Sequence, residues 1–219
     1  MTSSEKGIMK TIDWYFDFIS PFSYLQLEAF GRLPPDVEVT LRPVLFAGLL
    51  SHWGHKGPAE IPAKRRFTYR FVQWLAERDQ VQLKFPPKHP FNPIKALRLA
   101  IAAGNGIEPV RTIFRHIWRE GKSIDVDKEW SELCTTVGVA DPDATINEPQ
   151  IKEKLKRNGE RAVTAGVFGV PTFVIDGEIF WGADATGMVV DYLNDPQRFW
   201  GGEFGRVANL PIGVERPRK

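Results

Sequence analysis

Hydrophobic and polar positions change their pattern three times along the chain. In the first part, the apolar run at 14–19 predicts a buried strand, which Ser20-Pro21 interrupts before a segment of helical character at 22–30. A break rich in Gly and Pro follows, and residues 37–42 then alternate between apolar and polar, as in a half-buried strand. A strand–helix–strand unit this short favours a parallel strand pair with a right-handed crossover.

The middle of the chain has helical periodicity. Apolar side chains recur every three or four residues, which predicts amphipathic helices. The two clearest sets are Phe67, Phe71, Trp74, Leu75 and Val110, Ile113, Phe114, Ile117, Trp118. Further helices are predicted at 96–103, 127–137 and 149–165.

The last part returns to strands. The runs 172–175 and 178–181 flank Asp176-Gly177, a strong signal for a two-residue hairpin turn. A closing helix is predicted at 184–193, and the Gly-, Pro- and Arg-rich end from about 201 predicts a loosely ordered tail.

The element order is therefore β-α-β, a helical block, and β-β-α, and neither strand-rich part can close a core alone. This order predicts an α/β fold, a thioredoxin-like domain with an inserted all-helical domain. The discontinuous thioredoxin-like domain takes residues 10–43 and 164–200, the helical insertion takes 44–163, and tails take 1–9 and 201–219.

Composition narrows the class of protein. The 219 residues include 42% apolar residues, and 29 Lys and Arg against 27 Asp and Glu leave a net charge of +2, which excludes the basic signature of a nucleic-acid binder. No apolar run approaches the ~18 residues of a membrane span, and no signal peptide or metal-ligand spacing is visible. Cys134 is the single cysteine, so no C-x-x-C pair exists, and its helical apolar pattern predicts burial. We expect a soluble cytoplasmic protein.

Three stretches carry a resemblance to a known family: DWYFDFISPFSYL, FPPKHPFNPIKALRLA and GVFGVPTFVIDGEIFWGADA. Together they resemble the 2-hydroxychromene-2-carboxylate isomerases and, more distantly, the kappa-class glutathione transferases, both within the thioredoxin-like superfamily. The resemblance runs from about residue 11 to 195. Its most specific parts are the serine-proline junction around Ser20 and the V-F-G-V-P-T sequence that ends at Thr172.

The resemblance implies that glutathione is the cofactor and that its thiol does the chemistry. Ser20 then contacts the sulfur, as the catalytic residue, at a helix N-terminus whose free N–H groups and dipole favour an anion. From the residues alone, Ser20 is also a good N-cap with Pro21 as the first helical residue, and the two roles can coexist.

The same resemblance assigns the remaining glutathione contacts. Val170 pairs its backbone with the tripeptide next to a cis Pro171, Asp184 binds the γ-glutamyl amine, Ala183 offers a backbone N–H, and Lys64 binds a carboxylate. The alternatives are a trans proline at a strand start, a helix-capping aspartate and a solvated lysine.

Four residues are weaker candidates near the sulfur or substrate. His55 stands where related proteins often carry asparagine, and Lys56 is a second candidate for a carboxylate. Asn92 either lines the pocket mouth or caps the helix that follows Pro93, and Trp181 either walls an aromatic-substrate pocket or belongs to the core.

The function that the resemblance implies is glutathione-dependent isomerisation of 2-hydroxychromene-2-carboxylate to trans-o-hydroxybenzylidenepyruvate in aromatic hydrocarbon catabolism. The partners are a small aromatic ketoacid substrate and a second copy in a homodimer. Two alternatives stay open. One is a kappa-type glutathione transferase or peroxidase, and the other is a non-catalytic protein that binds glutathione or a peptide on the same fold.

Overall fold

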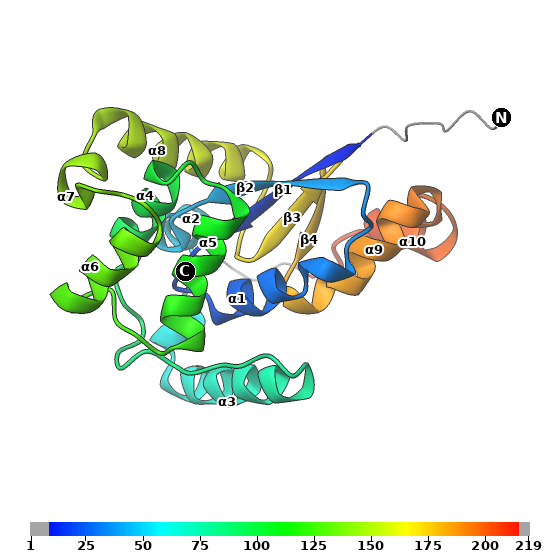
Figure 1. Cartoon of the computed structure of the whole chain (residues 1–219). Coiled ribbons are helices and arrows are strands. Elements are labelled where there is room, and N and C mark those ends of the chain that lie inside the picture. The colour runs from blue at the N-terminus through cyan, green and yellow to red at the C-terminus, as the bar shows by residue number, and fades with distance from the viewer. Residues whose placement is uncertain (1–8, 215–219) are drawn as a thin grey trace.

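A single mixed sheet joins the two strand-rich parts of the chain in the computed structural model, which describes residues 9–214 (Figure 1). The strand order is β2-β1-β3-β4. β1 (Lys10–Phe16) pairs in parallel with β2 (Val37–Pro43), and on its other side it pairs antiparallel with β3 (Thr172–Ile175), which pairs antiparallel with β4 (Glu178–Trp181). The predicted thioredoxin-like fold is confirmed.

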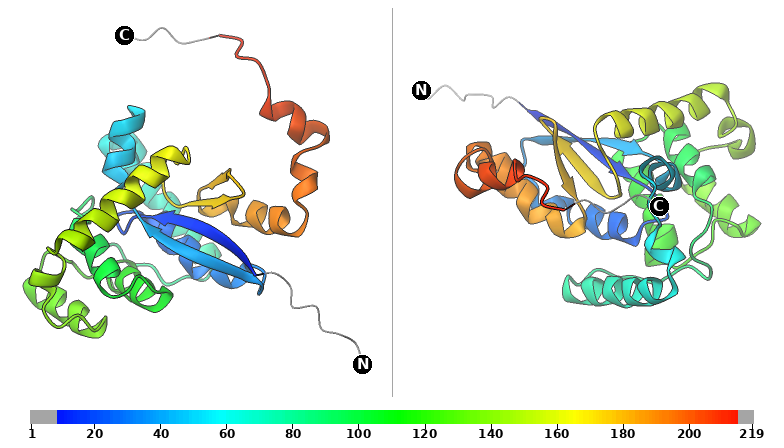
Figure 2. Two further views of the ribbon diagram at one scale, coloured as in Figure 1. Left: turned by 90° about the horizontal axis from the view of Figure 1, so that it is seen from above. Right: turned by 180° about the vertical axis from the view of Figure 1, so that it is seen from behind.

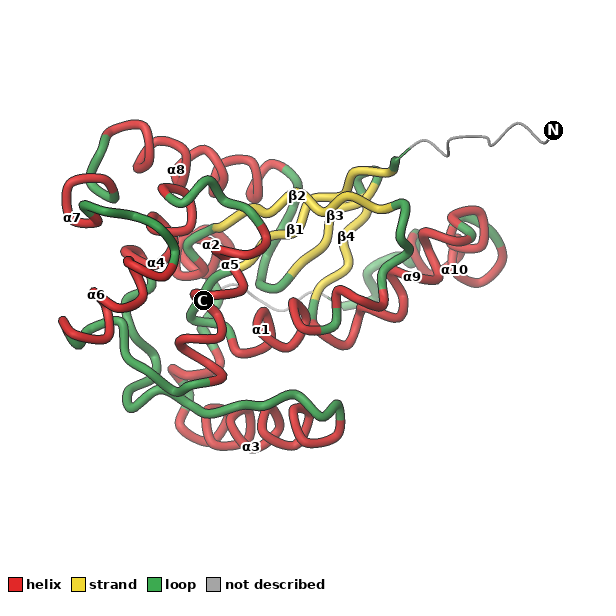
Figure 3. Tube along the Cα trace, in the orientation of Figure 1, coloured by secondary structure: helices red, strands yellow, loops and turns green. Residues whose placement is uncertain are grey.

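The helices follow the predicted order. α1 (Pro21–Glu28) joins β1 to β2, and α9 (Thr186–Asn194) and α10 (Gly202–Ala208) follow β4. The helical block contains α2 (Phe46–Trp53), α3 (Pro62–Arg78), α4 (Ile94–Ala102), α5 (Ile107–Phe114), α6 (Asp127–Thr136), α7 (Pro142–Thr145) and α8 (Pro149–Thr164). A π-turn at Arg115–Arg119 extends α5, and a long loop joins α3 to α4 (Figure 3).

Alternation along β1 creates two cores. Trp14 and Phe16 point to the face that α1 and α9 cover, where the Trp14 and Phe16 rings stack with centroids 4.6 Å apart. Tyr15 points to the opposite face and packs with buried residues of α2 and α8, and the views from above and behind show α8 away from α1 and α9 (Figure 2). The larger core includes buried residues of both the sheet and the helical block, so the division at 43/44 and 163/164 stays a prediction.

The hairpin turn confirms the Asp176-Gly177 signal. Asp176 has φ 53° and Gly177 has φ 88°, and a tight two-residue turn of type I′ requires positive φ at both central positions. None of the helices between residues 9 and 214 is both long and apolar enough to cross a membrane.

Two features differ from the sequence pattern. On α3 two of the predicted apolar residues face outward: Phe67 is 65% exposed and Trp74 is 54% exposed, while Leu75 is buried. The prediction of a loosely ordered end from about 201 also needs correction, because residues 202–208 form α10. An aromatic contact holds this helix, with the Phe199 and Phe204 ring centroids 4.8 Å apart, and an Arg206–Glu203 ion pair spans one of its turns.

Candidate active site

Ser20 lies at the junction between β1 and α1 and caps the helix. Its backbone is extended, with φ −93° and ψ 112°, and its Oγ accepts a hydrogen bond from the Ser23 N–H at 3.2 Å. The residue is only 7% exposed. Pro21 occupies the first helical position, where its missing N–H costs nothing. The capping role of Ser20 is therefore confirmed.

The predicted cis proline faces this helix end. The Val170–Pro171 peptide bond is cis, and the Val170 carbonyl oxygen lies 3.5 Å from the Ser20 Oγ. The Pro171 carbonyl accepts from the Gly182 N–H at 2.9 Å, which anchors the residues that follow β4. Two segments 150 residues apart in the chain thus meet at one hydroxyl group.

A buried glutamine fixes the third segment of the site against α1. Gln26 accepts from the Trp14 indole N–H at 2.7 Å and donates to the Gly182 carbonyl at 2.8 Å and to the Thr186 hydroxyl at 3.1 Å. Its side-chain amide is fully used, and the residue is 0% exposed. This network holds the short 3₁₀ turn Ala183–Ala185 beside α1, with Asp184 exposed on it.

Asp17 is a functional candidate that the sequence reasoning missed. Its carboxylate accepts from the Phe46 N–H at 2.8 Å and the Ile19 N–H at 3.1 Å, and its backbone carbonyl accepts from the Ser20 N–H at 3.0 Å. The side chain is completely buried, and this burial raises the Asp17 pKa to about 7 although its backbone N–H donors lower it. The only signal in the sequence is an acidic residue directly after a buried strand.

His89 supports the same loop from the helical block. Its Nε2 lies 2.8 Å from the Ile19 carbonyl oxygen and its Nδ1 lies 2.6 Å from the Tyr69 hydroxyl. Burial lowers the pKa of His89. Together, Asp17 and His89 bind the residues immediately before Ser20 from two sides.

The loop after α2 approaches the cis-proline segment. The Trp53 indole N–H donates to the Val167 carbonyl at 3.0 Å, and Gly54 ends α2 in the left-handed conformation with φ 65°. His55 and Lys56 follow, and both are exposed, as is Lys64 in the first turn of α3. Their predicted roles stay predictions.

Trp181 and Asn92 have clear local roles. Trp181 is 55% exposed and is therefore not a core residue, and a Cβ at Gly169 would lie 2.6 Å from its Nε1, so the indole covers that glycine. Asn92 accepts at 3.1 Å from the N–H of Ile94, the first residue of α4, but it lies one residue before the N-cap, Pro93, so it forms a turn that leads into the helix. Cys134 is buried in α6 as predicted.

No group of three or more His, Cys, Asp or Glu side chains in the described part of the chain is placed to hold a metal ion. The arrangement offers hydrogen-bond donors at a helix N-terminus that faces an extended segment ending in a cis proline. These features suit an anionic, peptide-like ligand.

Comparison with known proteins gives consistent matches, of which three follow. The model of the DsbA-like thioredoxin domain matches residues 11–194. The 2-hydroxychromene-2-carboxylate isomerase of Sphingobium xenophagum is 30% identical over 195 residues, which cover 85% of this chain and 99% of the relative. Glutathione S-transferase kappa 1 of Caenorhabditis elegans is 24% identical over 220 residues, covering 91% and 97%.

A solved structure of a 2-hydroxychromene-2-carboxylate isomerase has the same fold as this chain. Its TM-score is 0.73 at 23% identity, and the match covers 86% of this chain and 96% of that chain.

Proposed function

The chain belongs to the DsbA-like thioredoxin family and to its branch of 2-hydroxychromene-2-carboxylate isomerases and kappa-class glutathione transferases, and on this premise we propose that it is a glutathione-dependent isomerase. The proposed reaction interconverts 2-hydroxychromene-2-carboxylate and trans-o-hydroxybenzylidenepyruvate. The observation that carries the proposal is the Ser20 hydroxyl, which stands at the N-terminus of α1 within 3.5 Å of the Val170 carbonyl in a chain whose only cysteine is Cys134 on α6.

When bound, glutathione would supply a thiolate that adds to the double bond of the unsaturated ketoacid, which forms when the hemiketal C–O bond of the chromene ring breaks; the resulting single bond would rotate, and the double bond would re-form as the thiolate leaves. The protein must therefore stabilise an anion on sulfur. The Ser20 Oγ uses a lone pair to cap α1, and its only other partner among residues 9–214 is the Val170 carbonyl at the long distance of 3.5 Å. Its proton is thus available to the sulfur, and the positive end of the α1 dipole adds to the stabilisation.

The segment around Val170 supports binding of the tripeptide backbone. Among the hydrogen bonds of residues 9–214, the backbone of Val170 has only the long contact with Ser20. Its N–H and carbonyl are therefore available for strand-like pairing with an extended peptide.

In this proposal, charged side chains bind the two ends of glutathione. Asp184 binds the γ-glutamyl amine, with the Ala183 N–H beside it, and Lys64 binds a carboxylate. Lys56 and His55 serve the substrate carboxylate or the sulfur, and Trp181 and Asn92 border the aromatic substrate. All of these except Ala183 are exposed, as groups that meet a diffusing ligand must be.

Ser20→Ala tests the proposal. A hydrogen bond to a charged group contributes about 1.5–3 kcal/mol, so its loss raises the pKa of the bound thiol by roughly 1–2 units and lowers kcat/KM by about 10–100-fold. The thiol pKa is measured from thiolate absorbance of the glutathione complex across pH.

Ser23→Ala is the matched control. The Ser23 hydroxyl is buried one turn along α1 and has no hydrogen-bond partner in the described part of the chain, so its removal leaves the thiol pKa where it is. An unchanged thiol pKa in Ser20→Ala, or an equal change in both variants, contradicts the role of Ser20.

Binding and turnover separate the candidate functions. We expect glutathione to bind by calorimetry and 2-hydroxychromene-2-carboxylate to turn over only in its presence. Binding with conjugation of 1-chloro-2,4-dinitrobenzene and no chromene turnover would identify the kappa-type transferase, which the kappa relatives favour as the second candidate. Binding without either activity would identify a binding protein, and no glutathione binding would refute both enzyme functions. The proposal also includes a role in aromatic hydrocarbon catabolism and a cytoplasmic location. It further includes a homodimer, which sedimentation analysis tests.

A further inference from the structure

The peptide group between Ile19 and Ser20 is bound at both of its polar ends. Its carbonyl oxygen lies 2.8 Å from the His89 Nε2, and its N–H donates to the Asp17 backbone carbonyl at 3.0 Å. A peptide group is planar, so hydrogen bonds on its two opposite edges resist rotation of the whole plane. Because this plane leads directly into the Cα of Ser20, it sets the direction in which the Ser20 side chain leaves the backbone.

The hydrogen bonds of His89 determine its tautomer. A carbonyl oxygen only accepts, so Nε2 carries the proton that binds Ile19. Burial, with a smaller effect from Arg65, lowers the pKa of His89 below 6.5 although the bond to Ile19 raises it, so the ring is neutral at pH 7. The other nitrogen, Nδ1, is then an acceptor, and the Tyr69 hydroxyl 2.6 Å away donates to it. Tyr69 therefore orients the ring that binds Ile19.

Aromatic side chains confine the His89 ring on several sides. Its centroid lies 5.3 Å from that of Tyr69, 6.0 Å from that of Phe91 and 5.4 Å from that of Trp118, each in an edge-to-face contact. Trp118 also binds the same turn, since its indole N–H donates to the Phe18 carbonyl at 2.8 Å. Two neighbouring side chains of the helical block thus hold consecutive carbonyls of the residues before α1.

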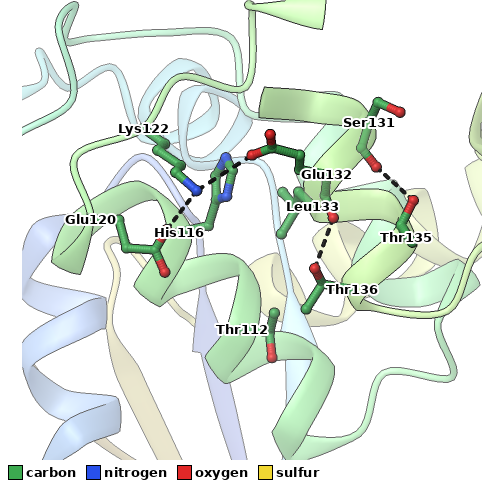
Figure 4. Close-up of a pocket in the computed structure, with 9 residues that line it drawn as sticks. All are labelled: Thr112, His116, Glu120, Lys122, Ser131, Glu132, Leu133, Thr135 and Thr136. Atoms are coloured by element: carbon green, nitrogen blue, oxygen red, sulfur yellow. Dashed lines mark hydrogen bonds and ion pairs between the residues drawn. The ribbon is translucent and has the colours of Figure 1, made fainter. Parts of the chain in front are cut away.

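The π-turn at Arg115–Arg119 brings Trp118 to this position. Single π-turns occur frequently at functional sites. Two residues earlier on the same turn, His116 lines a separate polar cavity, in which the charged side chains already pair with one another (Figure 4). The π-turn thus directs Trp118 to the residues before Ser20 and His116 to a different surface.

The geometry of the Ser20 cap is sensitive to this support. The Ser23 N–H donates to the Ser20 Oγ at 3.2 Å, which is at the upper end of the usual range for an N–H···O hydrogen bond. A small rotation of the Ile19–Ser20 peptide group would therefore break the cap and move the Oγ away from the N-terminus of α1.

We propose that His89 is a positioning residue for Ser20: by binding the Ile19 carbonyl it holds the Ile19–Ser20 peptide group, and so keeps the Ser20 side chain where the N-terminus of α1 stabilises an anion. This inference rests on the proposed function only for the identity of that anion, the thiolate of glutathione. It gives the helical block a part in the chemistry at Ser20, through a side chain that acts on the backbone before it.

The reporter for this role is the Ser20→Cys variant, whose thiol titrates without any ligand. Cysteines at helix N-termini have pKa values of about 3.5–7.5, against about 8.5 for a free cysteine, and we expect the reporter thiol in the lower range. Its pKa is measured from the rate of alkylation by iodoacetamide across pH, with mass spectrometry of the peptide that contains position 20. This readout separates it from Cys134.

Two replacements of His89 in this reporter test the role, and neither changes the charge of the neutral ring. His89→Leu removes the donor to Ile19 and should raise the thiol pKa by about 1 pH unit. His89→Gln supplies an amide N–H donor in place of Nε2 and should keep the thiol pKa within about 0.3 of the reporter value.

Tyr24→Phe in the reporter is the matched control. It removes a hydrogen bond of the same kind, from the Tyr24 hydroxyl to the Gln82 carbonyl at 2.8 Å, which joins α1 to the loop that carries His89. It should leave the thiol pKa unchanged. A reporter pKa that stays at about 8.5, no rise with His89→Leu, an equal rise with Tyr24→Phe, or no rescue by His89→Gln overturns the proposal.

If His89→Leu does not fold, Tyr69→Phe in the reporter decides, because it keeps His89 but removes the donor that orients its ring. A rise of the thiol pKa supports the proposal, and an unchanged pKa overturns it. The titration contains no glutathione. A failure of glutathione to bind would therefore refute the proposed function without affecting this test.

Discussion

The buried carboxyl group of Asp17 makes the stability of the protein depend on pH in a direction opposite to that of an ordinary paired aspartate. Two hydrogen bonds from the Ile19 and Phe46 N–H groups favour the ionised form of Asp17. Burial disfavours the ionised form, because the residue is 0% exposed. Burial is the larger effect, and it raises the pKa from 3.8 to about 7. The perturbation that isolates this group is Asp17→Asn.

The magnitude follows from linkage. Because the folded-state pKa lies above the unfolded value, the folded protein holds more protons between pH 4 and 7, so the contribution of Asp17 to the free energy of unfolding falls as pH rises through this window. At ~1.4 kcal/mol per pH unit, the difference between 3.8 and about 7 corresponds to about 4 kcal/mol. Below about pH 4 and above about pH 7 this contribution is constant.

The Ile19 and Phe46 N–H groups donate to different carboxylate oxygens of Asp17, and in asparagine one of these oxygens is replaced by an NH2 donor. Asp17→Asn therefore loses one hydrogen bond, about 1–3 kcal/mol, at every pH. The variant is therefore less stable than the wild-type protein at pH 4. Between pH 4 and 8 the free energy of unfolding of Asp17→Asn rises by about 4 kcal/mol relative to that of the wild-type protein. At pH 8 the variant is therefore as stable as the wild-type protein or more stable.

Urea denaturation of both proteins at each pH unit from 4 to 8 measures this difference, in which the titrations of all other groups cancel. Asp36→Asn, at an exposed position in the turn before β2, controls for the removal of a surface carboxylate. Parallel stability curves for wild type and Asp17→Asn would refute the reasoning. A wild-type advantage that grows with pH would show that the N–H donors outweigh burial and that the pKa is lowered.

Two further predictions concern buried groups away from the titration of Asp17. Gln26→Met leaves the buried Trp14 indole N–H and the half-buried Gly182 carbonyl without their partner. We therefore expect the free energy of unfolding, measured in urea titrations, to fall by about 2–5 kcal/mol. A fall below about 1 kcal/mol contradicts the network. Burial raises the pKa of Cys134 to about 11. The native thiol should therefore react with 5,5′-dithiobis(2-nitrobenzoic acid) at pH 8 roughly 100-fold or more slowly than the thiol of the urea-unfolded chain. Comparable rates for the two states contradict the burial of Cys134.

The fold was largely predictable because its signals are local. Period-two alternation at 37–42, the Asp176-Gly177 turn and the serine-proline helix start each depend on a few neighbouring residues, and each is present in the structure. The outward aromatic side chains of α3 were not predictable from spacing. Two rows of apolar side chains along α3 both have helical periodicity. The row of Val72, Leu75 and Ala76 is buried, whereas the row of Phe67 and Trp74 is exposed.

The residues that support the candidate site escaped prediction for a related reason. Gln26 reads as a polar residue in an amphipathic helix, and only the approach of Gly182, 156 residues later, makes it a buried bridge. Asp17 likewise acquires its role from Phe46, the first residue of α2. The spacing of polar residues carries no information about such long-range contacts, and the family resemblance names the proposed ligand-binding residues, from the buried Ser20 and Val170 to the exposed Asp184, but not the residues that support them.

The two interpretations of Ser20, as helix cap and as thiolate contact, use different parts of one hydroxyl group. Capping consumes a lone pair, because the Oγ accepts from the Ser23 N–H. Stabilising a thiolate consumes the proton, whose only partner within the described chain is the Val170 carbonyl at 3.5 Å, too far for a strong bond. The cap also keeps the Ser20 Oγ at the N-terminus of α1. Under the proposed function, a cysteine here would add a nucleophile that competes with the thiolate of glutathione, whereas serine adds a hydrogen-bond donor and no such nucleophile.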